Sequence, residues 1–128
     1  MTGEYCRRTI LIVEDDTDVR EAIAEILEDG KYRTLRAANG QIALQTLRGA
    51  KCMPCLILLD VMMPVMDAHE FRARQQEDAA LKQIPVVVLS AHVDAQHAAA
   101  QLSAAGFLKK PLDLPDLLRT VEQFCGKN

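Results

Sequence analysis

The sequence predicts an α/β fold built on an open, doubly wound parallel sheet, for three reasons. Apolar runs alternate with amphipathic helical patterns five times along the chain. Continuous apolar runs are typical of parallel strands that are buried on both faces. Strict alternation of strand and helix favours right-handed crossovers, with helices covering both sides of the sheet. Five such units in 128 residues are too few for an eight-stranded barrel, which takes about 250 residues.

Five apolar runs are predicted to be strands, because each is short, rich in β-branched residues or leucine, and bounded by polar or turn-forming residues. These runs lie at residues 10–13, 34–38, 56–59, 86–89 and 107–109. The run at 34–38 is the weakest, and Asn39-Gly40 ends it.

A helical pattern follows each strand, with apolar residues three and four positions apart on one face. The predicted helices cover residues 19–27, 42–47, 67–77, 94–104 and 114–124. Asp16 or Thr17 can cap the first helix, and Gly30 suits its end. Pro115 falls in the first turn of the last helix, where its missing N–H costs little.

Composition and charge narrow the class of protein. The chain is 49% hydrophobic and 26% charged, which is ordinary for one globular domain. Its net charge of −3 lacks the basic surplus of a free-standing nucleic-acid binder. No apolar run approaches the ~20 residues of a membrane span, and residues 1–9 lack the apolar stretch of a secretory signal. We therefore expect a cytoplasmic protein whose four cysteines are reduced.

Polar side chains gather at the carboxyl ends of four predicted strands. They are Glu14, Asp15 and Asp16 after the first strand, Asp60 after the third, Ser90 after the fourth, and Lys109-Lys110 after the fifth. Open α/β sheets bind ligands beyond these strand ends. Clustered carboxylates repel one another and usually bind a hard cation such as Mg²⁺. An aspartate can then attack phosphorus, while an ammonium and a hydroxyl stabilise the phosphoryl oxygens.

The motifs around these residues resemble the receiver domain of two-component response regulators, the CheY-like group. The matching segments are Ile10-Leu-Ile-Val-Glu-Asp-Asp16, Leu56-Ile-Leu-Leu-Asp-Val-Met-Met-Pro64, Met66-Asp67, Val86-Val-Val-Leu-Ser-Ala91 and Gly106-Phe-Leu-Lys-Lys-Pro111. The resemblance implies the flavodoxin/CheY-like strand order 2-1-3-4-5. It covers residues 9–125, so we expect short tails at 1–8 and 126–128 and no output domain in this chain.

The resemblance also implies a metal site beside a phosphorylated aspartate. Asp60 matches the aspartate that accepts the phosphoryl group. Mg²⁺ would be bound by Glu14, Asp15, Asp60 and the backbone carbonyl of Met62. Asp16 is an extra carboxylate and a less favoured ligand.

The remaining family residues would respond to the phosphoryl group. Ser90 matches the hydroxyl that bonds it, and Lys110 matches the lysine that contacts it. Phe107 matches the aromatic residue that changes rotamer on activation, and a cis bond is implied before Pro111.

The implied function is a phosphorylation-controlled signalling switch in a two-component phosphorelay. A histidine kinase or histidine phosphotransfer protein would donate the phosphoryl group. A downstream protein would then bind the face formed by the fourth helix, fifth strand and fifth helix. We expect a monomer or a weak phosphorylation-dependent dimer, with no direct nucleic-acid binding and no membrane insertion. We expect no enzyme activity beyond self-catalysed phosphotransfer and autodephosphorylation.

Two other function classes stay open. A pseudo-receiver would bind its partner without phosphate, although the complete set of site residues argues against it. A phosphatase of the haloacid-dehalogenase type also uses an aspartate after a strand, but it needs a second acid two residues on, where Met62 stands.

The sequence departs from the family pattern at several positions. Ala68 and Ser103 stand where glycine is common, and the interval from Ser90 to Lys110 is about two residues short around the fourth helix. Cys52-Met-Pro-Cys55 precedes the third strand and lacks a second ligand pair, so we expect neither a redox nor a metal role for it.

Overall fold

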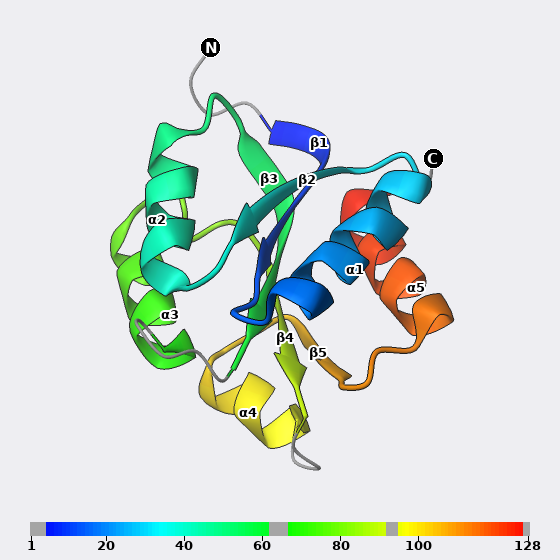
Figure 1. The fold of residues 1–128 in the computed structure, drawn as a ribbon. Coiled ribbons are helices and arrows are strands. Elements are labelled where there is room, and N and C mark those ends of the chain that lie inside the picture. The colour runs from blue at the N-terminus through cyan, green and yellow to red at the C-terminus, as the bar shows by residue number, and fades with distance from the viewer. Residues whose placement is uncertain (1–4, 62–66, 92–94, 127–128) are drawn as a thin grey trace.

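The computed structural model describes residues 5–61, 67–91 and 95–126. At its centre is a parallel sheet of five strands in the order β2-β1-β3-β4-β5 (Figure 1). The predicted fold class and strand order are therefore confirmed. The strands are β1 (Tyr5–Val13), β2 (Arg33–Ala37), β3 (Met53–Asp60), β4 (Val86–Ser90) and β5 (Gly106–Lys109).

The first strand begins earlier than expected. Tyr5 and Cys6 of β1 pair with Met53 and Pro54 of β3, before a register shift between Cys6 and Ile10. Residues 5–8, expected in an N-terminal tail, therefore belong to the sheet. The apolar pattern missed this extension because it depends on backbone pairing with a neighbouring strand, and Arg7-Arg8 interrupts the apolar run.

The helices in the described part of the chain alternate with the strands. They are α1 (Thr17–Asp29), α2 (Gly40–Gly49), α3 (Ala68–Glu77), α4 (Ala95–Gln101) and α5 (Leu114–Cys125). Side-chain oxygens of Asp16, Asn39, Asp67 and Asp113 accept backbone N–H groups in the first turns of α1, α2, α3 and α5. None of these helices has the length and apolar content that crossing a bilayer requires.

Two helices end on a left-handed residue that is not glycine. Lys31 follows α1 with φ 72°, and Ser103 follows α4 with φ 53°. Each is followed by the pair of backbone hydrogen bonds that closes a Schellman motif, including Tyr32 N–H to Leu27 O and Ala104 N–H to Ala99 O. The end at Ser103 explains why α4 stops at Gln101 rather than continuing to residue 104.

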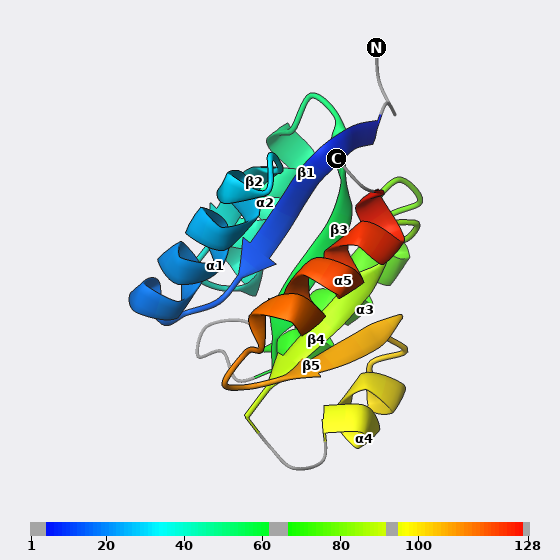
Figure 2. The same cartoon turned by 90° about the vertical axis from the view of Figure 1, so that its right-hand side faces the viewer.

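The sheet is covered on both faces, and each face has its own core. Side chains of α1 and α5 pack against one face, while α2, α3 and α4 pack against the other. In Figure 2, α1 and α5 lie on the viewer's side of the sheet, with α2 and α3 behind it. The first core includes Leu27, Leu117 and Val121. The second includes Phe71, the largest fully buried side chain among the described residues.

A disulfide joins the start of β3 to the end of α5. Cys55 and Cys125 are bonded, with their Cα atoms 5.5 Å apart, and Cys52 is also disulfide-bonded. The expectation of reduced cysteines is therefore wrong for these residues in this structure. The sequence did not indicate the Cys55–Cys125 pair because 70 positions separate its members, and only the packing of α5 on the sheet brings them together.

Candidate phosphoryl-transfer and metal site

Three carboxylates converge at the carboxyl end of the sheet. Glu14 follows β1, Asp15 comes next, and Asp60 is the last residue of β3. One oxygen from each lies within 4.8 Å of the other two. Glu14 and Asp60 are buried, whereas Asp15 is exposed. Like charges this close repel, so the cluster suits a divalent cation with hard oxygen ligands.

Lys110, the residue after β5, brings a positive charge to the same cluster. Its Nζ forms an ion pair with Glu14 and lies 3.4 Å from Asp60 Oδ1. Burial of the ammonium opposes its charge, but the hydrogen bond to Glu14 and the attraction of Asp60 and Glu14 outweigh this effect. The pKa of Lys110 is therefore raised above its ordinary value. The peptide bond from Lys110 to Pro111 is cis.

Ser90 and Phe107 lie on the two strands beyond Asp60. Ser90 ends β4, is buried, and accepts the backbone N–H of Lys110 at 2.9 Å with its carbonyl oxygen. Asp60 pairs in register with Leu89, so Ser90 stands one residue beyond the level of Asp60. Phe107 lies on β5 with 38% of its surface exposed. The strands thus bring the hydroxyl to the same rim as the carboxylates.

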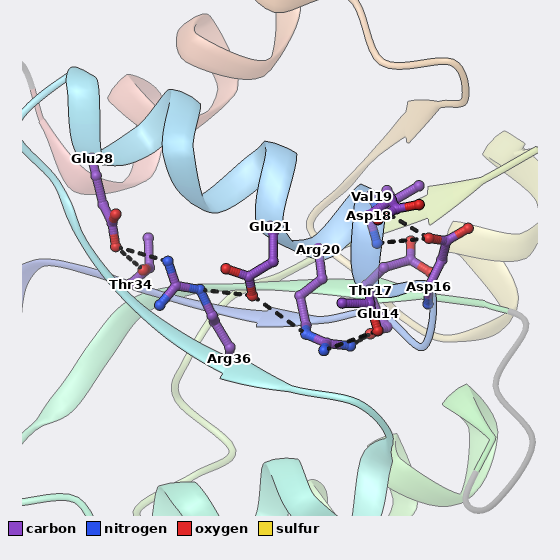
Figure 3. Close-up of polar contacts among 10 residues, drawn as sticks. All are labelled: Glu14, Asp16, Thr17, Asp18, Val19, Arg20, Glu21, Glu28, Thr34 and Arg36. Atoms are coloured by element: carbon purple, nitrogen blue, oxygen red, sulfur yellow. Dashed lines mark hydrogen bonds and ion pairs between the residues drawn. The ribbon is translucent and has the colours of Figure 1, made fainter.

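Asp16 has a different role from the carboxylates before it. Its Oδ1 accepts the N–H groups of Asp18 and Val19, so it caps α1 (Figure 3). It is not one of the three carboxylates that converge among the described residues. Met62, expected to offer a backbone carbonyl, lies outside the described residues.

The sequence reasoning missed Arg20. This side chain comes from the first turns of α1, and its Nη1 donates to the backbone carbonyl of Glu14 at 2.8 Å. Figure 3 shows Arg20 between Glu14 and Glu21, whose carboxylate also contacts Arg36 of β2 at 3.2 Å. The available signal was a basic residue four positions after the acidic residues 14–16. That signal does not distinguish an arginine that contacts the loop from one that extends into solvent.

Comparisons with known proteins agree with this geometry. The model of the response regulator receiver domain matches residues 10–122. Response regulator Rre1 of Synechocystis is 34% identical over 116 residues, which cover 88% of this chain and 49% of Rre1.

Two solved structures are similar over most of their length. Chemotaxis protein CheY4 of Vibrio cholerae has a TM-score of 0.79 at 28% identity, covering 91% of this chain and 97% of CheY4. The Mn²⁺-bound form of response regulator Rcp1 has a TM-score of 0.71 at 30% identity, covering 91% and 90%. Receiver domains are signalling domains that bind a divalent metal in an acidic pocket. The family model matches residues 10–122, and the fold and the acidic cluster agree with that match. This chain therefore belongs to the family of response regulator receiver domains.

Proposed function

We propose that the chain is a signalling switch of a two-component phosphorelay that is phosphorylated on Asp60. The observation that carries this proposal is the convergence of Glu14, Asp15, Asp60 and Lys110 on one rim of the sheet. Three carboxylates and one ammonium provide both a cation site and a contact for phosphoryl oxygens. Asp60, the proposed nucleophile, is one of the three carboxylates and also contacts Lys110.

The donor set fits a divalent cation. Glu14, Asp15 and Asp60 would bind Mg²⁺, together with the backbone carbonyl of Met62. Asp16 is a poorer candidate because its Oδ1 already accepts two backbone N–H groups. The related regulator Rcp1 has been solved with Mn²⁺, another cation that prefers oxygen ligands. A bound cation would neutralise charge on the carboxylates and on the incoming phosphoryl group.

The transfer itself uses Asp60 as the nucleophile. A carboxylate oxygen of Asp60 attacks the phosphorus of a phosphohistidine presented by a histidine kinase or a histidine phosphotransfer protein. The O–P bond forms as the N–P bond breaks, and the imidazole nitrogen leaves with the electron pair. The Lys110 ammonium contacts the phosphoryl oxygens and stabilises their negative charge, and the Ser90 hydroxyl donates a hydrogen bond to them. Water later attacks the phosphorus and releases inorganic phosphate.

The signal leaves through the face formed by α4, β5 and α5. Phe107 and Leu114 expose 38% and 48% of their surface near this face, so they offer apolar contact to a protein. Phosphorylation favours the state in which Ser90 bonds the phosphoryl group and Phe107 turns inward. We infer that this switch acts in the cytoplasm, as a monomer or a weak phosphorylation-dependent dimer. Its receiver unit is residues 5–125, because β1 begins at Tyr5.

Acetyl phosphate and Mg²⁺ test this proposal directly. Intact mass spectrometry should show one phosphoryl group on the wild-type chain, removable by hydroxylamine, and none on Asp60→Asn. Asp116→Asn, which changes an exposed carboxylate on α5, is the matched control and should be phosphorylated like wild type. A single adduct that persists in Asp60→Asn would place the modification elsewhere and refute the assignment of Asp60.

A second phosphodonor separates the switch from a pseudo-receiver. The proposed donor is a protein phosphohistidine, so the chain should also be incubated with a phosphorylated histidine phosphotransfer protein. Transfer to Asp60 supports the switch. Absence of transfer from both donors, in a protein that still unfolds cooperatively, would favour a scaffold that acts without phosphate.

A further inference from the structure

The Cys55–Cys125 pair lies at the end of the sheet opposite the acidic site. Cys55 stands five positions before Asp60 on β3, which puts the two residues roughly 16 Å apart along the strand. Cys125 is the last residue of α5. Neither cysteine touches the proposed phosphorylation site, so any role of this pair is additional to that of Asp60.

Side-chain packing, one hydrogen bond and the disulfide hold α5 to the rest of the domain. Only Leu117 and Val121 of this helix are buried, and both lie before its last turn. Beyond them, the Tyr32 hydroxyl donates to the Gly126 carbonyl at 2.8 Å, and the disulfide ties Cys125 to β3. Phe124 is only partly buried against the same core, so the disulfide adds a covalent link to a turn that is otherwise held by partly buried side chains and one hydrogen bond.

The two cysteines differ in their exposure to solvent. Cys55 is 9% exposed, whereas Cys125 is half-buried at the helix end. A soluble thiol or disulfide can therefore approach Cys125 more easily than Cys55. Cys55 Sγ also lies 3.2 Å from the Thr9 carbonyl oxygen. A reduced Cys55 thiol can donate to that carbonyl, so the fold accommodates both oxidation states.

We propose that Cys55 and Cys125 form a reversible thiol–disulfide couple that controls how firmly the last turn of α5 is held to the sheet. Its oxidant is a low-molecular-weight disulfide such as glutathione disulfide, and its reductant is the corresponding thiol. Disulfides in proteins of a reducing compartment are usually transient or redox-sensing. A chain of this length can also build a core without such a staple.

The exchange balances in two steps. The Cys125 thiolate, its proton lost to solvent, attacks one sulfur of glutathione disulfide, whose S–S bond breaks to release one glutathione thiolate. The Cys55 thiolate then attacks the Cys125 sulfur of the mixed disulfide and releases the second glutathione. The two cysteines lose two electrons together, glutathione disulfide gains them, and the two leaving thiolates take up the two protons.

Oxidation state then bears on the face that we propose for output. The N-terminal end of α5 is joined through Asp113 and the cis Lys110–Pro111 bond to the acidic site. Its C-terminal end is covalently bonded to β3 only in the oxidised form. Oxidised protein therefore has α5 restrained at both ends, and reduced protein has a last turn that can open.

Peptide mapping after differential alkylation tests the couple. The full chain is equilibrated at a series of glutathione-to-glutathione-disulfide ratios and quenched with one alkylating reagent, then reduced and labelled with a second. Cys55 and Cys125 should change from free to paired together and return on adding reductant. Because Cys52 is itself disulfide-bonded, Cys52→Ser is the control, and it should leave the Cys55–Cys125 transition unchanged. Two cysteines that stay alkylatable at every ratio would overturn the proposal.

Variants that each replace one cysteine of the pair test which sulfur reacts first. With glutathione disulfide, Cys55→Ser should trap a mixed disulfide at Cys125. Cys125→Ser should trap at least about tenfold less at Cys55, because that sulfur is buried. Equal trapping at the two positions would contradict the assigned order of attack.

Hydrogen exchange of the wild-type chain tests the effect on α5 without any substitution. Reduction should speed amide exchange in residues 122–126 by at least about tenfold, with residues 68–77 of α3 as the internal reference. In Cys52→Ser, which lacks the disulfide of Cys52, reduction should also lower the melting temperature by roughly 10 °C or more, because the Cys55–Cys125 bond closes a long loop. Identical exchange of residues 122–126 in the two oxidation states would show that the bond does not control this helix end.

Discussion

Arg20 holds the acidic loop by its backbone: its guanidinium Nη1 donates to the carbonyl oxygen of Glu14 at 2.8 Å. The Arg20 side chain is only 15% exposed, so this charged donor is largely removed from water. The contact joins the first turns of α1 to the residue that carries one of the three clustered carboxylates. We therefore regard Arg20 as a positioning residue for the metal site.

Arg20→Ala should weaken both the loop and cation binding. Loss of a partly buried, charged hydrogen bond costs about 1.5–3 kcal/mol of unfolding free energy, and Mg²⁺ affinity should fall several-fold because Glu14 is less firmly placed. Urea unfolding and calorimetric Mg²⁺ titration measure the two effects. Arg36→Ala is the control, because Arg36 contacts Glu21 and Glu28 at the surface and should cost less than about 1 kcal/mol. Equal Mg²⁺ affinity in Arg20→Ala and wild type would remove Arg20 from the site.

Lys110→Ala should destabilise the metal-free protein and make its stability depend more strongly on Mg²⁺. Without the ammonium, Glu14 and Asp60 lose their positive partner while they stay buried, so unfolding free energy should fall by about 1–3 kcal/mol. Mg²⁺ should then raise the melting temperature more than in wild type, because it no longer competes with Lys110. Thermal unfolding with and without Mg²⁺ measures this difference. Lys109→Ala, an exposed neighbour, should behave like wild type. A smaller Mg²⁺ effect in Lys110→Ala would contradict the competition.

Asp15→Asn should separate metal binding from folding. Asp15 is exposed, and its charge repels Glu14 and Asp60 when no cation is present. The free energy of unfolding without metal should therefore stay within about 0.5 kcal/mol of wild type or rise. Mg²⁺ affinity should fall by at least about tenfold, because one unit of ligand charge is lost. Denaturant curves and Mg²⁺ titration test the pair of results, and a large loss of metal-free stability would mean that Asp15 supports the fold instead.

Ser103→Gly and Lys31→Gly should each raise the free energy of unfolding by roughly 0.5 kcal/mol. A left-handed conformation costs a residue with a Cβ about 1–2 kcal/mol, and the greater freedom of glycine in the unfolded chain offsets part of that gain. Urea unfolding measures the change. Ala104→Gly is the control, since Ala104 has no positive φ among the described residues, and it should destabilise. Destabilisation by both glycine variants would show that side-chain contacts outweigh the backbone strain.

The sheet and most of its acidic rim were predictable from local pattern. Apolar runs located the strands, and in a parallel sheet all strands end at one rim, so Asp60 and Ser90 had to lie near residues 14–16. The same pattern placed the pair Lys109-Lys110 at this rim, and the family resemblance selected Lys110. Nothing in those patterns reported that Lys110 already pairs with Glu14 and Asp60, because side-chain pairing depends on the packed geometry.

Helix ends were less predictable. Gly30 suggested where α1 would stop, yet Lys31 takes the left-handed position. The reason is tertiary: Tyr32 is buried with Leu27 in one core, and its N–H bonds the Leu27 carbonyl. Burial of this ring sets the residue at which the chain turns. The Cys55–Cys125 bond could not be predicted for a similar reason. The sequence does not reveal which residues 70 positions apart become neighbours in the fold.

The two edge strands of the sheet, β2 and β5, limit how the protein can associate with other proteins. A strand with one unpaired side is a template for joining another chain, and charged side chains there discourage such joining. Arg33 and Arg36 are exposed on β2, and Lys109 is exposed on β5. Both edge strands thus carry cationic side chains that disfavour edge-to-edge strand pairing and aggregation. Association with partners is left to helix surfaces and side chains, where it can be made and released repeatedly.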